Sequence, residues 1–121
     1  MNFSFRPHER LTRSRDFDRA RRKGRRRVGR RLVLWAFRRE ESPARATRLG
    51  VVVGRRHGGA VQRNRFKRRV RDIFRTEKNR WPRGWDLVVT PKTGGPAFPP
   101  PHDDLRADFL FLVERSAHGD K

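Results

Sequence analysis

One short run concentrates the side chains of this chain that are best suited to bind phosphate: Arg63-Asn64-Arg65-Phe66-Lys67-Arg68-Arg69. A guanidinium offers a planar fork that grips phosphate through two hydrogen bonds and also stacks on bases. The glycine-flanked basic residues 54–59 come just before it, and N–H groups of such a loop and of a helix start favour phosphate. Most charge runs are only a solvated helix face. Here like charges four residues apart repel unless a partner shares them, so the run predicts polyanion binding.

A second group of residues is aromatic and consists of Phe17, Trp35 and Phe37. Together they would form a platform on which unpaired bases stack, a common mode of single-stranded RNA recognition. The alternative is that all three belong to the hydrophobic core. For Phe37 the core is the favoured interpretation, whereas for Phe17 and Trp35 both alternatives stay open.

Catalysis by the side chains of this chain alone has little support. The histidines lack metal-ligand spacing, and they are His8, His57, His102 and His118. The carboxylate pair Asp103-Asp104 lies at the expected start of a helix, where capping explains it. No nucleophile triad, Walker loop or dinucleotide fingerprint is present, and the lack of cysteine excludes thiolate zinc sites and cysteine nucleophiles. The sequence therefore predicts no catalytic residue and no metal ligand.

The net charge of the chain points to nucleic acid as the partner. The 121 residues include 33 Lys and Arg against 13 Asp and Glu, a net charge of +20. Such an excess repels itself in a compact state unless a polyanion shares it. Residues 1–83 hold 29 basic and 7 acidic residues, so they are expected to build the binding surface. No apolar run is long enough to span a bilayer and no secretory signal is evident, which predicts a cytoplasmic protein.

The residues that must position these groups fall into one expected domain, residues 14–115, followed by a flexible tail at 116–121. Periodicity and turn residues predict these elements in order: a flexible basic segment 1–13, a helix 15–23 capped by Ser14, a basic connection 24–31, a strand 32–37, a loop 40–46, a strand 49–53, a helix 61–80, a strand 85–90, a loop 91–101 and a helix 103–114. The first two strands are expected to be antiparallel neighbours. The strand-helix-strand order that follows indicates a βαβ unit with parallel pairing.

The predicted helix at residues 61–80 separates apolar and charged side chains on two faces. Its apolar face is Phe66, Val70, Ile73 and Phe74, at helical spacing for packing on a sheet. The opposite face is Asn64, Arg68, Arg71 and Arg75. One helix is thus expected to hold the core with one side and the polyanion with the other.

The segment around this helix start resembles the signature of the bacterial ribonuclease P protein subunit, in which an Arg-Asn-Arg element opens a helix bearing further Lys and Arg. The segment reads Gly58-Gly59-Ala60-Val61-Gln62-Arg63-Asn64-Arg65-Phe66-Lys67-Arg68-Arg69-Val70-Arg71. The flanking order is also similar, with Arg10-Leu11, Asp16-Phe17, Leu32-Val33-Leu34-Trp35, Leu49-Gly50-Val51-Val52-Val53 and Arg55-Arg56. The resemblance covers roughly residues 9–115.

The resemblance implies a single-domain α+β (α/β) sandwich with a central mixed sheet, three helices and a left-handed βαβ crossover, a type known from a ribosomal protein domain. It implies catalysis by an RNA subunit with Mg2+, while the protein binds that RNA and the single-stranded 5′ leader of precursor tRNA. The RNA-binding residues would be Arg55, Arg56, Arg63, Asn64, Arg65, Lys67, Arg68 and Arg71. The cleft for the leader would contain Phe17 and Trp35.

One position departs from the pattern of that family, because Arg21 stands where a second aromatic often lies one turn after Phe17. An arginine there can still stack by its plane or grip a phosphate. Two other function classes remain as alternatives: a ribosomal or other structural RNA-binding protein, and a nuclease that acts without an RNA subunit. Phosphate binding fits the first of these alternatives as well, and only residues 63–71 with their flanking strands favour ribonuclease P.

Overall fold

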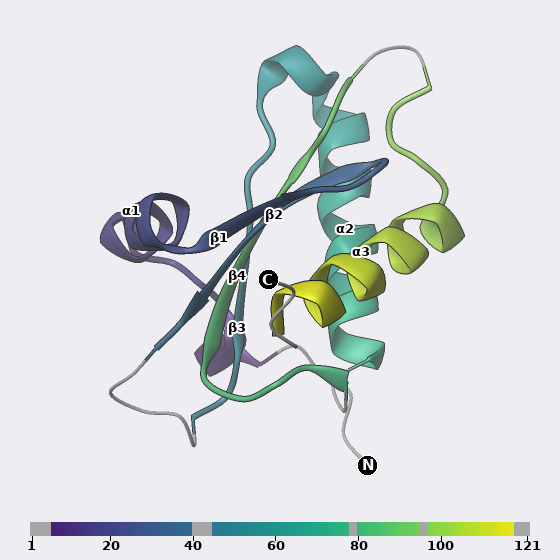
Figure 1. Cartoon of the computed structure of the whole chain (residues 1–121). Helices are drawn as coiled ribbons and strands as arrows, with labels where there is room; N and C mark the ends of the chain where they lie inside the picture. Colours follow the sequence, from purple (N-terminus) through teal and green to yellow (C-terminus); the bar gives the residue numbers. More distant parts are fainter. Residues whose placement is uncertain (1–5, 40–44, 78–79, 95–96, 118–121) are drawn as a thin grey trace.

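The computed structural model describes residues 6–39, 45–77, 80–94 and 97–117. Within these ranges the chain forms one four-stranded sheet and three α-helices, with two short 3-10 helices (Figure 1). In chain order the elements are η1 (Pro7–Glu9), α1 (Ser14–Lys23), β1 (Arg25–Val28), β2 (Leu32–Arg38), β3 (Arg48–Val51), η2 (Arg55–His57), α2 (Ala60–Thr76), β4 (Trp85–Pro91) and α3 (His102–Ala117).

The strand order in the sheet is β1-β2-β4-β3. β4 pairs parallel with β3 and antiparallel with β2, so β3, α2 and β4 form the predicted βαβ unit. The prediction that the strands at 32–37 and 49–53 are antiparallel neighbours is wrong, because β4 lies between them. Burial explains the order: Leu87, Val88 and Val89 are almost fully buried, which suits a central strand covered on both faces.

Helices cover both faces of the sheet, so the fold is the predicted α+β sandwich (Figure 1). α2 and α3 lie together on one face, and α1 lies on the other. Successive residues of β2 serve the two sides in turn: Leu34 and Ala36 pack in the main core with α2 and α3, whereas Trp35 and Phe37 join a smaller cluster under α1. The sheet therefore separates the main core from the aromatic residues, and β2 contributes side chains to both sides.

Residues 24–31 are not the simple connection that the sequence predicts, because Arg25–Val28 form β1, an edge strand antiparallel to β2. Three successive arginines carry no apolar alternation, so the sequence pattern does not reveal this strand. An exposed edge tolerates such residues, since their charge discourages further strand pairing. β1 thus adds basic side chains to a rigid element.

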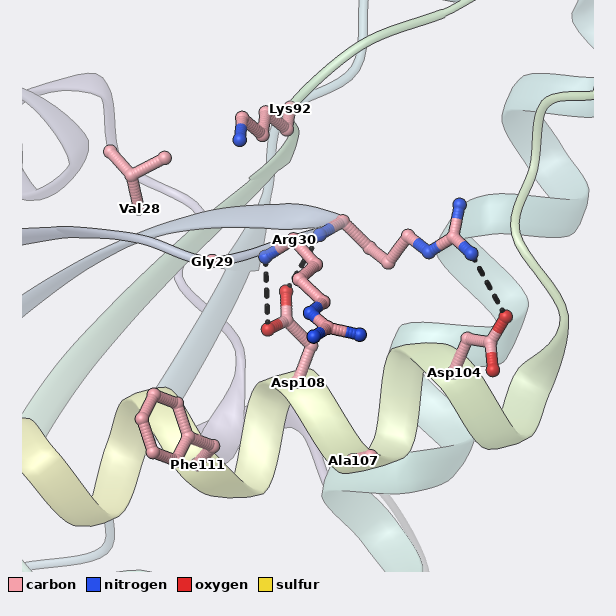
Figure 2. Close-up of a pocket in the computed structure, with 9 residues that line it drawn as sticks. Val28, Gly29, Arg30, Lys92, Asp104, Ala107, Asp108 and Phe111 are labelled. Atoms are coloured by element: carbon pink, nitrogen blue, oxygen red, sulfur yellow. Dashed lines mark hydrogen bonds and ion pairs between the residues drawn. The ribbon is translucent and has the colours of Figure 1, made fainter.

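The turn between β1 and β2 is held by a carboxylate from α3. Asp108 accepts hydrogen bonds from the backbone N–H groups of Arg30, Arg31 and Leu32 at 3.2, 2.9 and 2.9 Å. Figure 2 shows this carboxylate directly below the turn. A Cβ at Gly29 would lie 2.4 Å from both Asp108 carboxylate oxygens, so a larger residue there would displace this carboxylate from the turn. The contact fixes the hairpin against α3 and closes that side of the sandwich.

The folded part of the chain begins earlier than the flexible segment 1–13 suggests. Residues 7–9 form η1, Leu11 is buried, and its N–H donates to the carbonyl of Leu49 at 3.0 Å. Arg10 makes a parallel bridge beside the same residue, at the outer edge of β3. The segment therefore covers an open sheet edge and places Arg10 at a defined position.

The helix boundaries differ from the predicted ones by a few residues. Arg13, not Ser14, is the N-cap of α1. α2 stops at Thr76 instead of residue 80, because Trp81 turns back to donate its indole N–H to the Phe74 carbonyl at 2.8 Å. The predicted loop at 40–46 lies mostly outside the described residues. Among the residues described, no helix has the length and apolar character needed to cross a membrane.

The contact between Asp108 and the β1–β2 turn predicts a clear loss of stability on substitution. Asp108→Ala leaves three backbone N–H groups without their acceptor, and we expect the free energy of unfolding to fall by about 1–3 kcal/mol. Asp104→Ala, which removes an exposed ion pair with Arg31 at 3.3 Å and one of two carboxylates in the first turn of α3, is the matched control and should cost less than about 1 kcal/mol. Urea unfolding measures both, and equal losses would contradict the assigned role of Asp108.

Candidate nucleic-acid interface

The two faces of α2 lie as the sequence predicts. Phe66, Val70 and Ile73 are fully buried and Phe74 is 1% exposed, so this side of the helix packs in the main core. On the predicted charged side, Asn64, Arg68 and Arg71 are exposed, whereas Arg75 is half-buried and pairs with Asp72. The apolar side thus fixes the position of the helix, and the charged side is free to meet a polyanion.

The charged side of α2 forms a groove of about 410 Å³ together with the N-terminal segment. The groove is lined by Arg10, Asn64, Lys67, Arg68, Arg71, Asp72 and Arg75. Four of the eight predicted RNA-binding residues therefore share one concave surface. Arg10 was not among those predictions, because nothing in the sequence shows that the N-terminal segment folds beside this helix.

Asp72, the carboxylate that lines the groove, does not cancel the positive charge of the groove. Asp72 pairs with Arg75 and lies 3.2 Å from the His102 ring, and the hydrogen bond from Arg75 holds the pKa of Asp72 below its ordinary value. Although Arg71 is exposed overall, its partial desolvation within the groove lowers its pKa, and the nearby charge of Arg10 lowers this pKa further. Like charges are thus crowded into the groove, which favours an anion between them.

The other four predicted residues flank the groove. Arg55 and Arg56 are exposed on η2, just before α2, and Arg65 is exposed on α2 itself. Arg63 is half-buried, and its Nε is buried without a hydrogen-bond partner in the part of the chain that the structure describes. These residues extend the basic surface around the helix start but do not line the groove.

The loop that carries Arg55 and Arg56 is fixed by His57, which is 5% exposed. The Gly54 N–H donates to His57 Nδ1 at 3.0 Å, and the ring lies 6.1 Å from the Phe98 ring. Burial lowers the pKa of His57, and the charge of Arg56 adds to this effect. His57 is therefore a neutral structural residue near pH 7, and it holds the two arginines beside the start of α2.

The aromatic residues gather on the opposite side of the sheet, under α1. Phe17, Trp35 and Phe37 are all half-buried and pack against Leu11, Ala20 and Val88. Phe37 packs against this hydrophobic cluster, as the core interpretation expects, but it is only half-buried and lies on the same partly open side of the sheet as Trp35. A Cβ at Gly50 would lie 2.4 Å from the Phe17 ring, so glycine lets this ring pack directly on β3.

Arginines lie over the exposed faces of these rings. The Arg21 guanidinium carbon is 5.2 Å from the centre of the Trp35 ring, and Arg26 is 6.0 Å from the same ring. Arg19 lies 4.7 Å from the centre of the Phe37 ring. Both rings thus make cation–π contacts. This face of the sheet therefore presents guanidinium groups together with aromatic rings.

A buried carboxylate, Asp86, organises the arginines at the end of this face. It accepts hydrogen bonds from Arg48 Nε and Nη2, each at 2.8 Å, from Arg19 at 3.4 Å, and from the buried Arg39. Burial raises the pKa of Asp86, but hydrogen bonds from Arg48 and Arg39 outweigh it and hold the pKa below the ordinary value. Asp86 therefore stays charged and ties β3, β4, α1 and the residue that follows β2 together.

Comparison with known proteins decides the family. The model of the family described as Ribonuclease P matches residues 5–116, which is nearly the whole chain. The chain belongs to the ribonuclease P protein family. Both the charged side of α2 and the aromatic cluster fall within the matched residues.

Individual relatives agree with this assignment. The ribonuclease P protein component of Syntrophobacter fumaroxidans is 45% identical over 92 residues, which are 74% of this chain and 74% of that protein. The protein component of Chloroflexus aurantiacus is 41% identical over 109 residues, 88% of this chain and 76% of its own length. The solved structure of the RNase P protein from Thermotoga maritima has a TM-score of 0.75 and 32% identity, covering 88% of this chain and 96% of that chain.

The pH dependence of stability tests the role of Asp86 in this ribonuclease P protein. Asp86→Asn leaves buried arginines without their counter-charge, and we expect a loss of about 3–5 kcal/mol at neutral pH. The folded-state pKa of Asp86 is lowered, so its stabilisation is present above the unfolded-state pKa of about 3.9 and is lost as the pH falls through the folded value. The difference between wild type and Asp86→Asn should therefore shrink on acidification. A difference that is constant from pH 7 to pH 3 would contradict this account.

Proposed function

We propose that this chain acts as the protein component of ribonuclease P, the ribonucleoprotein that removes the 5′ leader of precursor tRNA. The observation that carries the proposal is the charged side of α2, which combines the family's Arg-Asn-Arg start with a concave basic groove. The protein binds RNA there and supplies no group that attacks the phosphodiester bond. The cleaving centre belongs to the RNA subunit.

We assign the α2 groove and its flanking arginines to contact with the RNA subunit or with precursor tRNA. The groove offers guanidinium and ammonium groups at several positions along one helix, a pattern that follows successive phosphates of a folded RNA. Arg55 and Arg56 extend this surface beyond the helix start. Because the groove holds no exposed aromatic ring, it is suited to the RNA backbone and not to base stacking.

We assign the aromatic cluster under α1 to the single-stranded 5′ leader. Unpaired nucleotides expose both phosphates and base faces, and this side of the sheet offers ring planes covered by guanidinium planes. Arg21 compensates for the missing second aromatic by stacking on Trp35. The leader contact of this chain is therefore expected to depend more on salt than a purely aromatic platform does.

Mg2+ is the cofactor that we propose for the complete ribonucleoprotein, acting mainly with the RNA subunit. It is a hard cation that prefers oxygen ligands and retains several waters, so RNA phosphates suit it well. The arginine and lysine side chains of the protein neutralise phosphate charge, which metal ions must otherwise do. Less Mg2+ should then be needed when the protein is bound.

Reconstitution with a ribonuclease P RNA subunit tests the proposal. At low Mg2+ we expect the protein to increase the rate of 5′ leader removal from precursor tRNA. Arg68→Ala should weaken this effect, and its binding to RNA should show a salt slope shallower by about 0.7–0.9, because one phosphate contact is lost. Its thermal stability should stay near that of wild type, since Arg68 is exposed.

Two controls separate binding from folding in that experiment. Ile73→Ala opens a cavity in the core and should lower stability by about 2–5 kcal/mol without changing the salt slope. Arg115→Ala removes the same charge from α3, away from the groove, and should leave the slope unchanged. No gain in leader removal with the wild-type protein would contradict the proposal, and cleavage without any RNA subunit would favour the alternative of a self-sufficient nuclease.

The stacked arginine at position 21 gives a prediction of its own. Arg21→Ala should reduce the affinity gained from the leader by about two- to fivefold, since one exposed cation–π contact between the guanidinium and a base of the strand would be worth about 0.5–1 kcal/mol. Arg21→Phe should keep most of this affinity but with a shallower salt slope. Binding of precursor and mature tRNA to the reconstituted enzyme measures the gain. An equal loss with mature tRNA would show that Arg21 does not act on the leader.

A further inference from the structure

A second concave basic surface lies at the start of α1 and is separate from the α2 groove. Its volume is about 750 Å³, and it brings together arginines from five parts of the chain. They come from the N-terminal segment, α1, the position just after β2, the start of β3 with its approach, and the approach to β4: Arg10, Arg13, Arg15, Arg19, Arg39, Arg45, Arg48 and Arg83. We call this surface the arginine pocket.

The carboxylates near the arginine pocket are already used by particular arginines. Asp16 lies 3.6 Å from Arg19 and 3.5 Å from Arg48, and Asp86 binds Arg39 and Arg48. Arg13 and Arg15 are exposed at its rim. The acidic groups thus neutralise the floor of the pocket and leave its rim strongly positive.

The positions of Arg13 and Arg15 oppose the stability of α1. Arg13 is the N-cap of the helix and Arg15 is in its first turn, where the positive end of the helix dipole disfavours cations. No side chain caps this helix start, although Ser, Thr, Asp or Asn is preferred there. A fold optimised for stability alone would place acidic or capping residues at these positions. The presence of arginine at these two positions is therefore better explained by the binding of an external anion than by the stability of the fold.

The arginine pocket also connects the two surfaces already described. Arg10 lines both this pocket and the α2 groove. Arg19 lines the pocket and at the same time lies over the Phe37 ring of the aromatic cluster. A polyanion bound at either surface therefore has a continuous basic path into the pocket.

We propose that the arginine pocket is a further RNA site, which holds backbone phosphates through Arg13, Arg15 and their neighbours. The proposal rests on the function proposed above, because it takes RNA as the polyanion. Guanidinium groups from several elements converge on one hollow, which suits the tetrahedral array of phosphate oxygens. The phosphates come either from the 5′ leader beyond the aromatic cluster or from the RNA subunit beyond the α2 groove.

The test uses the full-length double variant Arg13→Gln, Arg15→Gln. Its binding is measured against salt in two arms: to the RNA subunit alone, and, after reconstitution, to precursor tRNA compared with mature tRNA. We expect weaker binding in one arm, with a salt slope shallower by about 1–2 because each lost phosphate contact contributes about 0.7–0.9. A loss in the first arm assigns the phosphates to the RNA subunit, and a loss only with precursor assigns them to the leader.

A charge-matched control makes the outcome decisive. Lys92→Gln, Arg115→Gln removes two positive charges near α3 and should leave both slopes close to wild type. Thermal unfolding of the Arg13 and Arg15 variant should be unchanged or higher, because cations leave the helix start. Wild-type binding by the double variant in both arms, or an equal loss of affinity in the control, overturns the proposal that the arginine pocket binds RNA. Arg68→Ala serves as the reference in the same assay: if it still weakens binding, the proposed function stands without the pocket.

Discussion

The packing of α2 against the sheet is the interaction on which the rest of the structure depends. Phe66, Val70, Ile73 and Phe74 join the residues of β2, β4 and α3 in one core. Their burial fixes the helix so firmly that its outer side can carry a dense set of like charges, which would otherwise destabilise a helix. The same packing turns that charge into a defined surface, because the groove is formed only when α2 lies beside the N-terminal segment.

A few carboxylates make this basic chain compatible with a compact fold. Asp86 joins arginines from α1, from β3 and from the position just after β2, while Asp108 joins α3 to the β1–β2 turn. Each of these two carboxylates accepts hydrogen bonds from donors that the fold brings close to it, and neither carboxylate lies on the outer side of α2. The negative charge of the chain therefore holds the scaffold together, and the positive excess stays on surfaces open to RNA.

The parts of this structure that sequence reasoning predicted depend on local patterns. The two sides of α2 follow from helical periodicity over several turns, and the βαβ unit follows from element order. The order of the strands did not follow, since it depends on how deeply β4 is buried compared with β3. β1 was not predicted, because its three successive arginines show no apolar alternation. Asp86 and Asp108 bind residues 38 and 76 positions away, and no local pattern reveals such contacts.

We propose that the charged side of α2 meets the RNA subunit or precursor tRNA, and site-specific crosslinking in the reconstituted complex tests this claim most directly. The chain has no cysteine, so Asn64→Cys and Phe111→Cys each introduce one unique attachment point for a photoreactive group. Asn64 lines the groove, and Phe111 is 53% exposed on α3. Crosslinks to the RNA subunit or to precursor tRNA from position 64 but not from position 111 are the predicted result. Crosslinks from position 111 alone would contradict the account.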